Sequence, residues 1–283
     1  MNLKKQTVAL IILAVIVATF SILHAFTEVS LDAIFGFIIS FIIRLYIVII
    51  AVAVLLFLAS RIVRRMRSKI DKTMLILWEE CDPERAAREI IRHIDGTSAR
   101  NKQVRDIGKN NLSVVYFSVG EFDKAIETLE SITLDIEKQG EVASTNAFVR
   151  YNLALNYIGK GELWIAAPHI ESLRGYRETA KAGMAKGRRD MQQMYAMLEE
   201  LIAGLEAVAA IKEGKGESVL AFFELALSKA NTRYNKVYAH FHLAAIYEQM
   251  GDTQKQREHL EYVAENGNLL DMVRVAREKL GLV

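Results

Sequence analysis

The chain has 283 residues, 52% of them hydrophobic, with 36 Lys and Arg against 34 Asp and Glu. Outside residues 1–60 the count is 33 basic and 32 acidic residues, a balance that excludes a general nucleic-acid binder, which needs a strong basic excess. The single cysteine, Cys81, excludes an internal disulfide framework and a cysteine-based zinc site.

The first predicted element is an apolar run over residues 7–26, which follows Lys4 and Lys5 and contains no charged residue. A helix of this length spans about 30 Å, the thickness of the hydrocarbon core of a bilayer. A cleaved signal peptide is the rival interpretation. Signal cores are shorter, however, at about 7–15 residues, and here a second apolar run follows at once. We therefore expect an uncleaved transmembrane helix.

The second predicted element is the apolar run over residues 33–60. The connection at residues 27–32 holds two acids and no Lys or Arg, whereas basic residues lie at both outer ends of the pair of runs. The positive-inside rule then places both termini in the cytoplasm and predicts a multi-pass protein of the cell membrane. A basic juxtamembrane segment, residues 61–72, follows and should contact anionic headgroups. Its basic residues include Arg61, Arg64, Arg65, Arg67 and Lys69.

Arg44 interrupts the second run near its middle. An unpaired arginine inside the membrane costs several kcal/mol, and the first run offers it no acidic partner. One interpretation is a long, tilted helix from which Arg44 snorkels to the surface. The other is an ion pair with a partner membrane subunit.

From residue 73 to residue 283 the sequence predicts helix after helix, because apolar residues recur at intervals of three and four. Short breaks between the predicted helices contain a glycine followed by an acid. A left-handed glycine ends one helix, and the acid lies near the start of the next. The spacings of 41, 55 and 35 residues are typical of stacked helical hairpins. The pairs are Gly120-Glu121, Gly161-Glu162, Gly216-Glu217 and Gly251-Asp252.

Three of these breaks share further positions. A small residue stands seven before the glycine, a Tyr stands four before it, and an Ala stands five after each of the first two glycines. The residues are Ser113, Ala154 and Ala244; Tyr116, Tyr157 and Tyr247; Ala125 and Ala166. The pattern resembles the tetratricopeptide repeat, clearly over 106–135, 147–175 and 237–265 and weakly over 193–230. The Cys-Asp-Pro-Glu start at residues 81–84 and the Glu-Asn-Gly ending at residues 265–267 resemble those of membrane-anchored bacterial repeat proteins.

The resemblance implies an all-α fold, in which a two-helix transmembrane hairpin precedes a tetratricopeptide-like α-solenoid. Pro168 falls inside a second helix and is expected to kink or shorten it. At the two ends, Asp82 is a predicted N-cap before Pro83, and a final helix is predicted over 269–280. These end segments are expected to act as caps with one solvated face.

Motifs for catalysis or cofactor binding are absent from the sequence. There is no phosphate-binding glycine loop and no paired-histidine zinc motif, and His240 and His242 are two residues apart, so they face different ways on a helix. Cys81 follows Glu79 and Glu80 and precedes Asp82, and these acids oppose thiolate formation. We expect no enzyme, no metal and no cofactor.

In the family, the first helix of each hairpin lines a concave groove, so the resemblance places a protein or peptide site there. Amides, aromatics and an imidazole at these positions suit an extended peptide or a partner helix. The alternative is that the apolar members are inter-helix core. The paired basic residues with which some family members clamp a carboxylate are missing. The predicted groove residues are Asn110, Asn111, Val114, Phe117, Tyr151, Asn152, Leu155, Ile158, Phe241, His242 and Glu248.

The sequence therefore predicts a membrane-tethered scaffold or adaptor that binds a protein or peptide partner and no nucleic acid. The alternatives are a structural subunit of a membrane complex that uses the transmembrane hairpin, and a regulator that responds to a peptide signal. A basic stretch at residues 174–189 is either a solvated loop or helix extension, or a contact for an acidic partner or the membrane surface.

Overall fold

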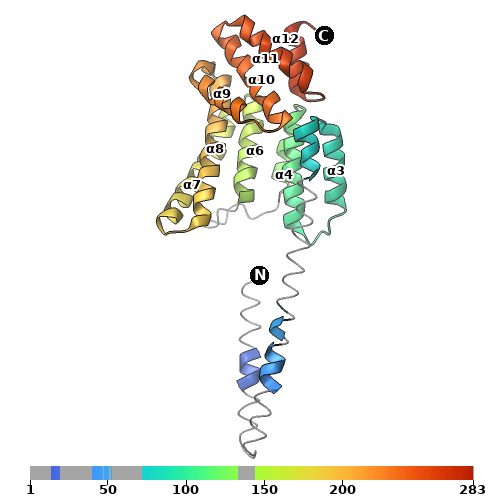
Figure 1. Cartoon of the computed structure of the whole chain (residues 1–283), viewed down its shortest axis with the longest axis vertical. Coiled ribbons are helices and arrows are strands. Elements are labelled where there is room, and N and C mark those ends of the chain that lie inside the picture. Colours follow the sequence, from blue (N-terminus) through green and yellow to red (C-terminus); the bar gives the residue numbers. More distant parts are fainter. Residues whose placement is uncertain are drawn as a thin grey trace, which may run out of the picture. The chain divides into compact units, whose positions relative to one another are not determined.

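The computed structural model describes residues 14–19, 40–46, 48–50, 52, 72–132 and 144–282. The chain divides into two compact units, Met1–Arg64 and Arg65–Val283. Every regular element in the described ranges is helical and none is a strand, which confirms the all-α class (Figure 1).

The first unit is described only in short helical pieces. Most of their apolar side chains are exposed, and Arg44 is exposed between Ile43 and Leu45. Among the described residues, no helix has the length and apolar character needed to cross a bilayer. Most of the predicted spans, 7–26 and 33–60, lies outside the described residues, as do all the basic residues predicted to touch headgroups: Arg61, Arg64, Arg65, Arg67 and Lys69.

The second unit is a series of helices, most of them joined by short turns, and residues 133–143 between two of them lie outside the described residues. A helical stretch at residues 72–75 leads into a π-helical turn, η1 (Ile76–Glu80). The helices that follow are α3 (Pro83–Asp95), α4 (Lys102–Ser118), α5 (Phe122–Glu130), α6 (Ser144–Lys160), α7 (Leu163–Ala185), α8 (Arg189–Lys212), the 3₁₀ turn η2 (Gly216–Val219), α9 (Leu220–Lys229), α10 (Arg233–Met250), α11 (Thr253–Asn266) and α12 (Asp271–Leu280).

Neighbouring helices pack as hairpins: α4 with α5, α6 with α7, and α10 with α11 (Figure 1). The first helices of successive hairpins also contact one another, α4 with α6, α6 with α8, and α8 with α10. These four helices therefore form a continuous row, and the small residues predicted at the helix contacts are buried. Ala154, Ala166 and Ala244 are all at most 2% exposed.

Left-handed glycines end the first helix of three hairpins, as predicted. Gly120, Gly161 and Gly251 have φ angles of 76°, 83° and 75°. The fourth predicted turn is wrong by two residues, because Gly214 is left-handed there, with φ of 76°. Gly216 instead opens η2, and its N–H donates to Gln249 Oε1 at 2.8 Å, so contact with α10 sets its position.

Pro168 does not shorten its helix. α7 runs through it for 23 residues, and α8 matches it with 24, which explains the 55-residue spacing. The proline removes only the bond to the carbonyl of Trp164, a residue that is 78% exposed and open to water. Within the basic stretch, Arg174 and Arg177 belong to this helix extension and pair with acids of α8, Glu206 at 2.7 Å and Glu199 at 2.9 Å.

The first and last hairpins of the second unit share one hydrophobic core. Leu77, Ile90 and Leu112 from the first part of the unit belong to the same buried cluster as Val237 and Val263 from the last part. The two end segments keep one solvated face each, at Arg88 of α3 and Arg277 of α12 for example, but their other faces meet in this shared core. An array of hairpins that contacts only its sequence neighbours would leave them apart.

Two hydrogen bonds, here together called the clasp, join residues 80–81 to residues 268–269. Asn268 Nδ2 donates to the Glu80 carbonyl at 3.0 Å, and Leu269 N–H donates to the Cys81 carbonyl at 3.3 Å. Cys81 and Asn268 have φ angles of 51° and 53°, and they are the only non-glycine residues with positive φ in the described ranges. Such a conformation costs of order 1 kcal/mol or more, so the surrounding contacts must hold it.

Candidate functional site

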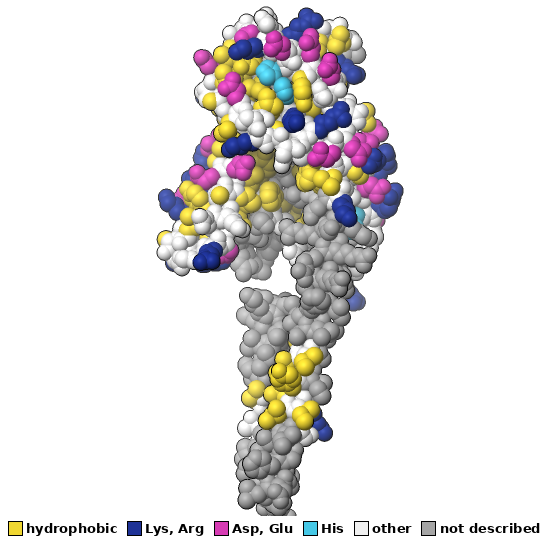
Figure 2. Space-filling model, in the orientation of Figure 1, with side chains coloured by type: hydrophobic (Ala, Val, Ile, Leu, Met, Phe, Trp, Pro, Cys, Tyr) yellow, Lys and Arg dark blue, Asp and Glu magenta, His cyan; other side chains and the backbone are white. Residues whose placement is uncertain are grey.

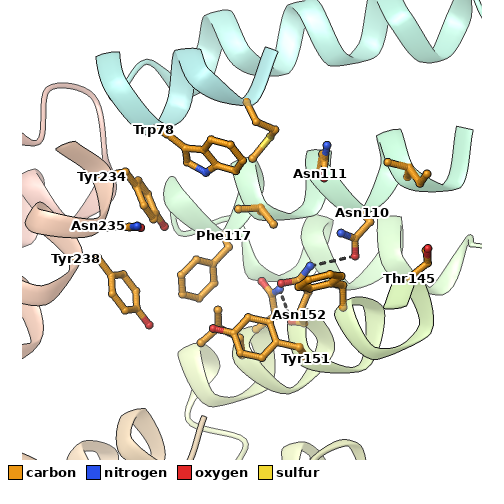
Figure 3. A pocket seen from close by; sticks show the side chains of 16 residues that line it. Trp78, Asn110, Asn111, Phe117, Thr145, Tyr151, Asn152, Tyr234, Asn235 and Tyr238 are labelled. Atoms are coloured by element: carbon orange, nitrogen blue, oxygen red, sulfur yellow. Dashed lines mark hydrogen bonds between the residues drawn. The ribbon is translucent and has the colours of Figure 1, made fainter. Parts of the chain in front are cut away.

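A cavity of about 520 Å³ lies in the second unit between η1, α4, α6 and the first turns of α10 (Figure 3). Hydrophobic side chains gather in the hollow that the unit presents in Figure 2. The lining residues are Met74, Trp78, Ile107, Asn110, Asn111, Val114, Phe117, Thr145, Phe148, Tyr151, Asn152, Leu155, Asn156, Tyr234, Asn235 and Tyr238.

The cavity has two chemically different ends. Aromatic rings of η1, α4 and α10 form one of them, which we call the aromatic end, and amides and a hydroxyl of α4 and α6 form the other, the amide end (Figure 3). The row of first helices places these groups together, since α4 and α6 pack side by side. The aromatic end comprises Trp78, Phe117, Tyr234 and Tyr238; the amide end comprises Asn110, Asn111, Thr145 and Asn152.

Some amide groups at this site are paired and others are not. Asn152 Nδ2 donates to Asn110 Oδ1 at 3.0 Å, which links α6 to α4, and Asn156 Nδ2 donates to the Asn152 carbonyl at 2.7 Å. The other side of the Asn156 amide, Oδ1, is buried and accepts no hydrogen bond from any described residue. Asn111 is half-buried, and its side chain makes no hydrogen bond within the described ranges. The site therefore retains hydrogen-bonding capacity.

The described lining of the site carries no charged side chain. None of the described residues that line it is Asp, Glu, Lys, Arg or His. Burial raises the pKa of Tyr151 to about 12, with Glu200 adding to the shift, and burial also raises the pKa of Tyr234 and Tyr238 above the usual range. The phenols therefore stay protonated at physiological pH and act as neutral hydrogen-bonding groups.

Many of the predicted groove residues come together here. They share the concave side of the first two helices in the row, at matching distances from their glycine turns. Those that line the cavity are Asn110, Asn111, Val114, Phe117, Tyr151, Asn152 and Leu155.

The other predicted groove residues lie elsewhere. Ile158 is fully buried in the core, and Phe241 packs against the core shared by the two ends. His242 is only 9% exposed and lies against Phe223 and Tyr238. Glu248 pairs with Lys279 of α12 at 2.6 Å.

These differences arise because α10 approaches the cavity with its first turns. The lining positions on α10 are Tyr234, Asn235 and Tyr238, about two turns before the expected ones, and η1 adds Met74 and Trp78. Sequence reasoning missed them because it treated the helices as an open series and residues 70–80 as a terminal cap. A signal was present in the Tyr-Asn-x-x-Tyr spacing, which places these three side chains on one helix face.

Histidines and the cysteine lie outside the cavity. His240 Nδ1 lies 2.7 Å from His259 Nδ1 of α11, so His240 pairs across the hairpin and not with His242. In the described part of the chain, no group of three or more His, Cys, Asp or Glu side chains is arranged to hold a metal ion. Cys81 is fully buried, and burial raises the pKa of its thiol to about 11, which opposes thiolate formation.

Comparison of this chain with protein-family models, curated proteins and solved structures finds no match.

Proposed function

We propose that this chain is a membrane-tethered scaffold that binds a protein or peptide partner in the cavity of a tetratricopeptide-like solenoid. One observation carries the proposal: residues expected on the concave side of two successive hairpins line a single cavity with aromatic and amide walls. Cavities of about 300–1,000 Å³ that are mostly apolar and hold a few polar groups are typical binding sites.

Two features support a tetratricopeptide-like solenoid. The left-handed glycines fall at the predicted turns after α4, α6 and α10, and the first helices of successive hairpins pack in a row. The closure of the two ends on each other is an addition to that plan, and it converts a groove into a cavity.

The proposed tether is the pair of apolar runs at residues 7–26 and 33–60. The described pieces of these runs are helical and expose apolar side chains such as Val15, Ile42 and Ile49, as a lipid-facing helix would. In this proposal the second unit is cytoplasmic. Confinement to a membrane raises the effective concentration of the site for a partner at the same surface without any new contact. The role is binding, without catalysis and without a cofactor.

Site-specific photo-cross-linking in the full-length chain tests the proposal. A benzophenone side chain replaces Phe148, which is 38% exposed at the cavity, or Trp164, which is 78% exposed on α7 and does not line the cavity. We expect one protein adduct from position 148, absent from position 164 and recovered in the membrane fraction. Equal adducts at both positions, or none at position 148, would contradict cavity binding.

A second candidate function, a structural subunit of a membrane complex, is favoured by Arg44, whose exposed charge lies between exposed Ile43 and Leu45. In this case the partner binds Arg44 inside the bilayer. The variant Arg44→Leu would then abolish recovery of the partner while the cavity remains intact. The scaffold proposal expects the adduct at position 148 to survive this substitution.

A further inference from the structure

We infer that the cavity holds an internal, uncharged segment of an extended peptide, with an aromatic or aliphatic side chain at the aromatic end and the adjoining backbone amide at the amide end. This inference rests on the proposed function and adds the chemistry of the partner. It depends on the neutrality of the walls, on the separation of the two ends and on the hydrogen-bonding groups left open.

The uncharged lining of the cavity disfavours a charged ligand. A carboxylate or ammonium group moved from water into this cavity would lose hydration and find no opposite charge among the described lining residues. Both ends of a peptide chain carry such groups, and so do Lys, Arg, Asp and Glu side chains. The phenols of Tyr151, Tyr234 and Tyr238 can donate a hydrogen bond but supply no opposite charge, because burial keeps them protonated. A segment from within a chain, with apolar side chains, avoids the cost.

The amide end favours binding of a peptide backbone, because its hydrogen-bonding groups complement those of a peptide group. A peptide group offers one N–H donor and one C=O acceptor, and the side-chain amide of an asparagine offers the complementary pair. Asn111 has both groups open, and Asn156 Oδ1 is a buried acceptor that lacks a donor within the described residues. An unsatisfied buried acceptor costs roughly 1–3 kcal/mol, so an N–H donor that reaches it is favoured.

The same groups favour a peptide bound in an extended conformation over a helical one. The backbone amides in the middle of a partner helix are already hydrogen-bonded within the helix, so they have nothing to offer Asn111 or Asn156. A helix is also about 10 Å wide with its side chains, whereas the cavity of about 520 Å³ suits a few residues of a single strand of chain. The aromatic end then stacks the central side chain against Trp78 and Tyr238.

Tryptophan fluorescence of the full-length chain in lipid nanodiscs tests the inference. The chain has two tryptophans, and Trp164→Phe removes the exposed one, so the emission then reports on Trp78 in the cavity. The probes are N-acetylphenylalanine methylamide, which is neutral with two peptide groups; N-acetylphenylalanine, which carries a carboxylate at pH 7; and 2-phenylethanol, which has the ring without the amides.

We expect a saturable change in Trp78 emission with the methylamide, and binding weaker by about tenfold or more for the carboxylate, because its charge is unpaired in the cavity. In the matched variant, Asn111→Leu, the methylamide should bind at least about fivefold more weakly, as expected for loss of the donor and the acceptor that the Asn111 amide offers. Binding of 2-phenylethanol should be unchanged in this variant, which shows that the cavity remains intact.

Three results would overturn the inference. Equal or tighter binding of the carboxylate would assign the cavity to a chain terminus. Binding of 2-phenylethanol as tight as that of the methylamide, with no effect of Asn111→Leu, would make the cavity a site for apolar molecules. The absence of any emission change would remove the cavity as a ligand site. The first two results leave the proposed scaffold standing, and the third is separated from it by the cross-link at position 148, which detects a partner at the cavity independently of these small probes.

Discussion

At the scale of single residues, His242 combines a polar side chain with a core position. It is 9% exposed, with its ring centroid 4.9 Å from that of Phe223 and 4.4 Å from that of Tyr238. Burial lowers its pKa to about 3, and the charge of Lys212 adds to the shift. Its imidazole therefore stays neutral in the folded chain at physiological pH and behaves as an aromatic core residue.

The stability of the second unit should fall as the pH falls from 6.5 towards 3. In that range the unfolded chain binds a proton at residue 242, with a pKa near 6.5, and the folded chain does not. At pH 5 this linkage amounts to about 2 kcal/mol for His242 alone. The lowered pKa values of His169, His240 and His259 act in the same direction.

The measurement is urea unfolding followed by helical circular dichroism at pH 7 and pH 5. The variant His242→Leu removes one titrating group, so the loss of unfolding free energy between the two pH values should be about 2 kcal/mol smaller than in the unchanged chain. Comparing each variant with itself at two pH values cancels any effect of the substitution on packing. An equal loss in both proteins would show that His242 is not the buried titrating group described.

At the scale of elements, the packing of the junction between α11 and α12 can be tested by substituting two glycines, one in tightly packed and one in open surroundings. A Cβ at Gly267 would collide with the Val273 side chain and lie 3.0 Å from the Val263 carbonyl oxygen, whereas a Cβ at Gly204, within α8, would meet nothing within 4 Å. We expect Gly267→Ala to lower the free energy of unfolding by about 1–3 kcal/mol through overpacking. Gly204→Ala should raise it by up to about 1 kcal/mol, as is usual in a helix interior.

Thermal or urea unfolding of both variants beside the unchanged chain measures these changes. Gly204→Ala is the matched control, because both substitutions add one methyl group. If Gly267→Ala were neutral, the turn that carries the clasp would be looser than the packing around Gly267 implies.

The repeating elements were predictable because their signals are local. A glycine that needs a positive φ, a small residue at a helix contact and a tyrosine one turn away specify each hairpin within about 20 residues of sequence, so Gly120, Gly161 and Gly251 fall where expected. The left-handed turn at Gly214 and the uninterrupted α7 were not predictable in this way, because both depend on contacts with other helices or with solvent.

The cavity was predictable in part for the same reason. The asparagines and aromatics of α4 and α6 occupy repeated positions, and they line it together. The contributions of Trp78, Tyr234 and Tyr238 depend on which part of α10 meets η1, and this follows from the closure of the two ends. Closure is a tertiary event between residues far apart in sequence, and no periodicity encodes it.

At the scale of the whole second unit, the shared core makes the two ends one cooperative structure. Leu77 is fully buried in this core, and η1, to which it belongs, contacts both α3 and α10. Leu77→Ala should cost about 2–5 kcal/mol. It should speed hydrogen exchange in α11 and α12 as well as in α3, although α11 and α12 lie far from residue 77 in sequence.

Leu198→Ala is the control for this experiment, because Leu198 is equally buried but belongs to the other large core cluster, in α8. Its effect should be strongest in α7 and α8. If Leu77→Ala changed exchange only in η1 and α3, the unit would open from its ends like an ordinary linear array, and the shared core would contribute little to its stability.

The clasp has a consequence for how the protein is made. Its bond from Asn268 to Glu80 joins residues 188 positions apart, so the chain must pay the entropy of closing a very long loop before the contact forms. During translation, the helical hairpins can fold in order as they leave the ribosome, but Trp78 cannot face Tyr234 until α10 has been synthesised, and the clasp that joins the two ends forms only after residue 268. The nascent chain therefore passes through a stage in which the hairpins of α4 to α7 are complete and the cavity is not, which delays partner recognition until α10 has left the ribosome.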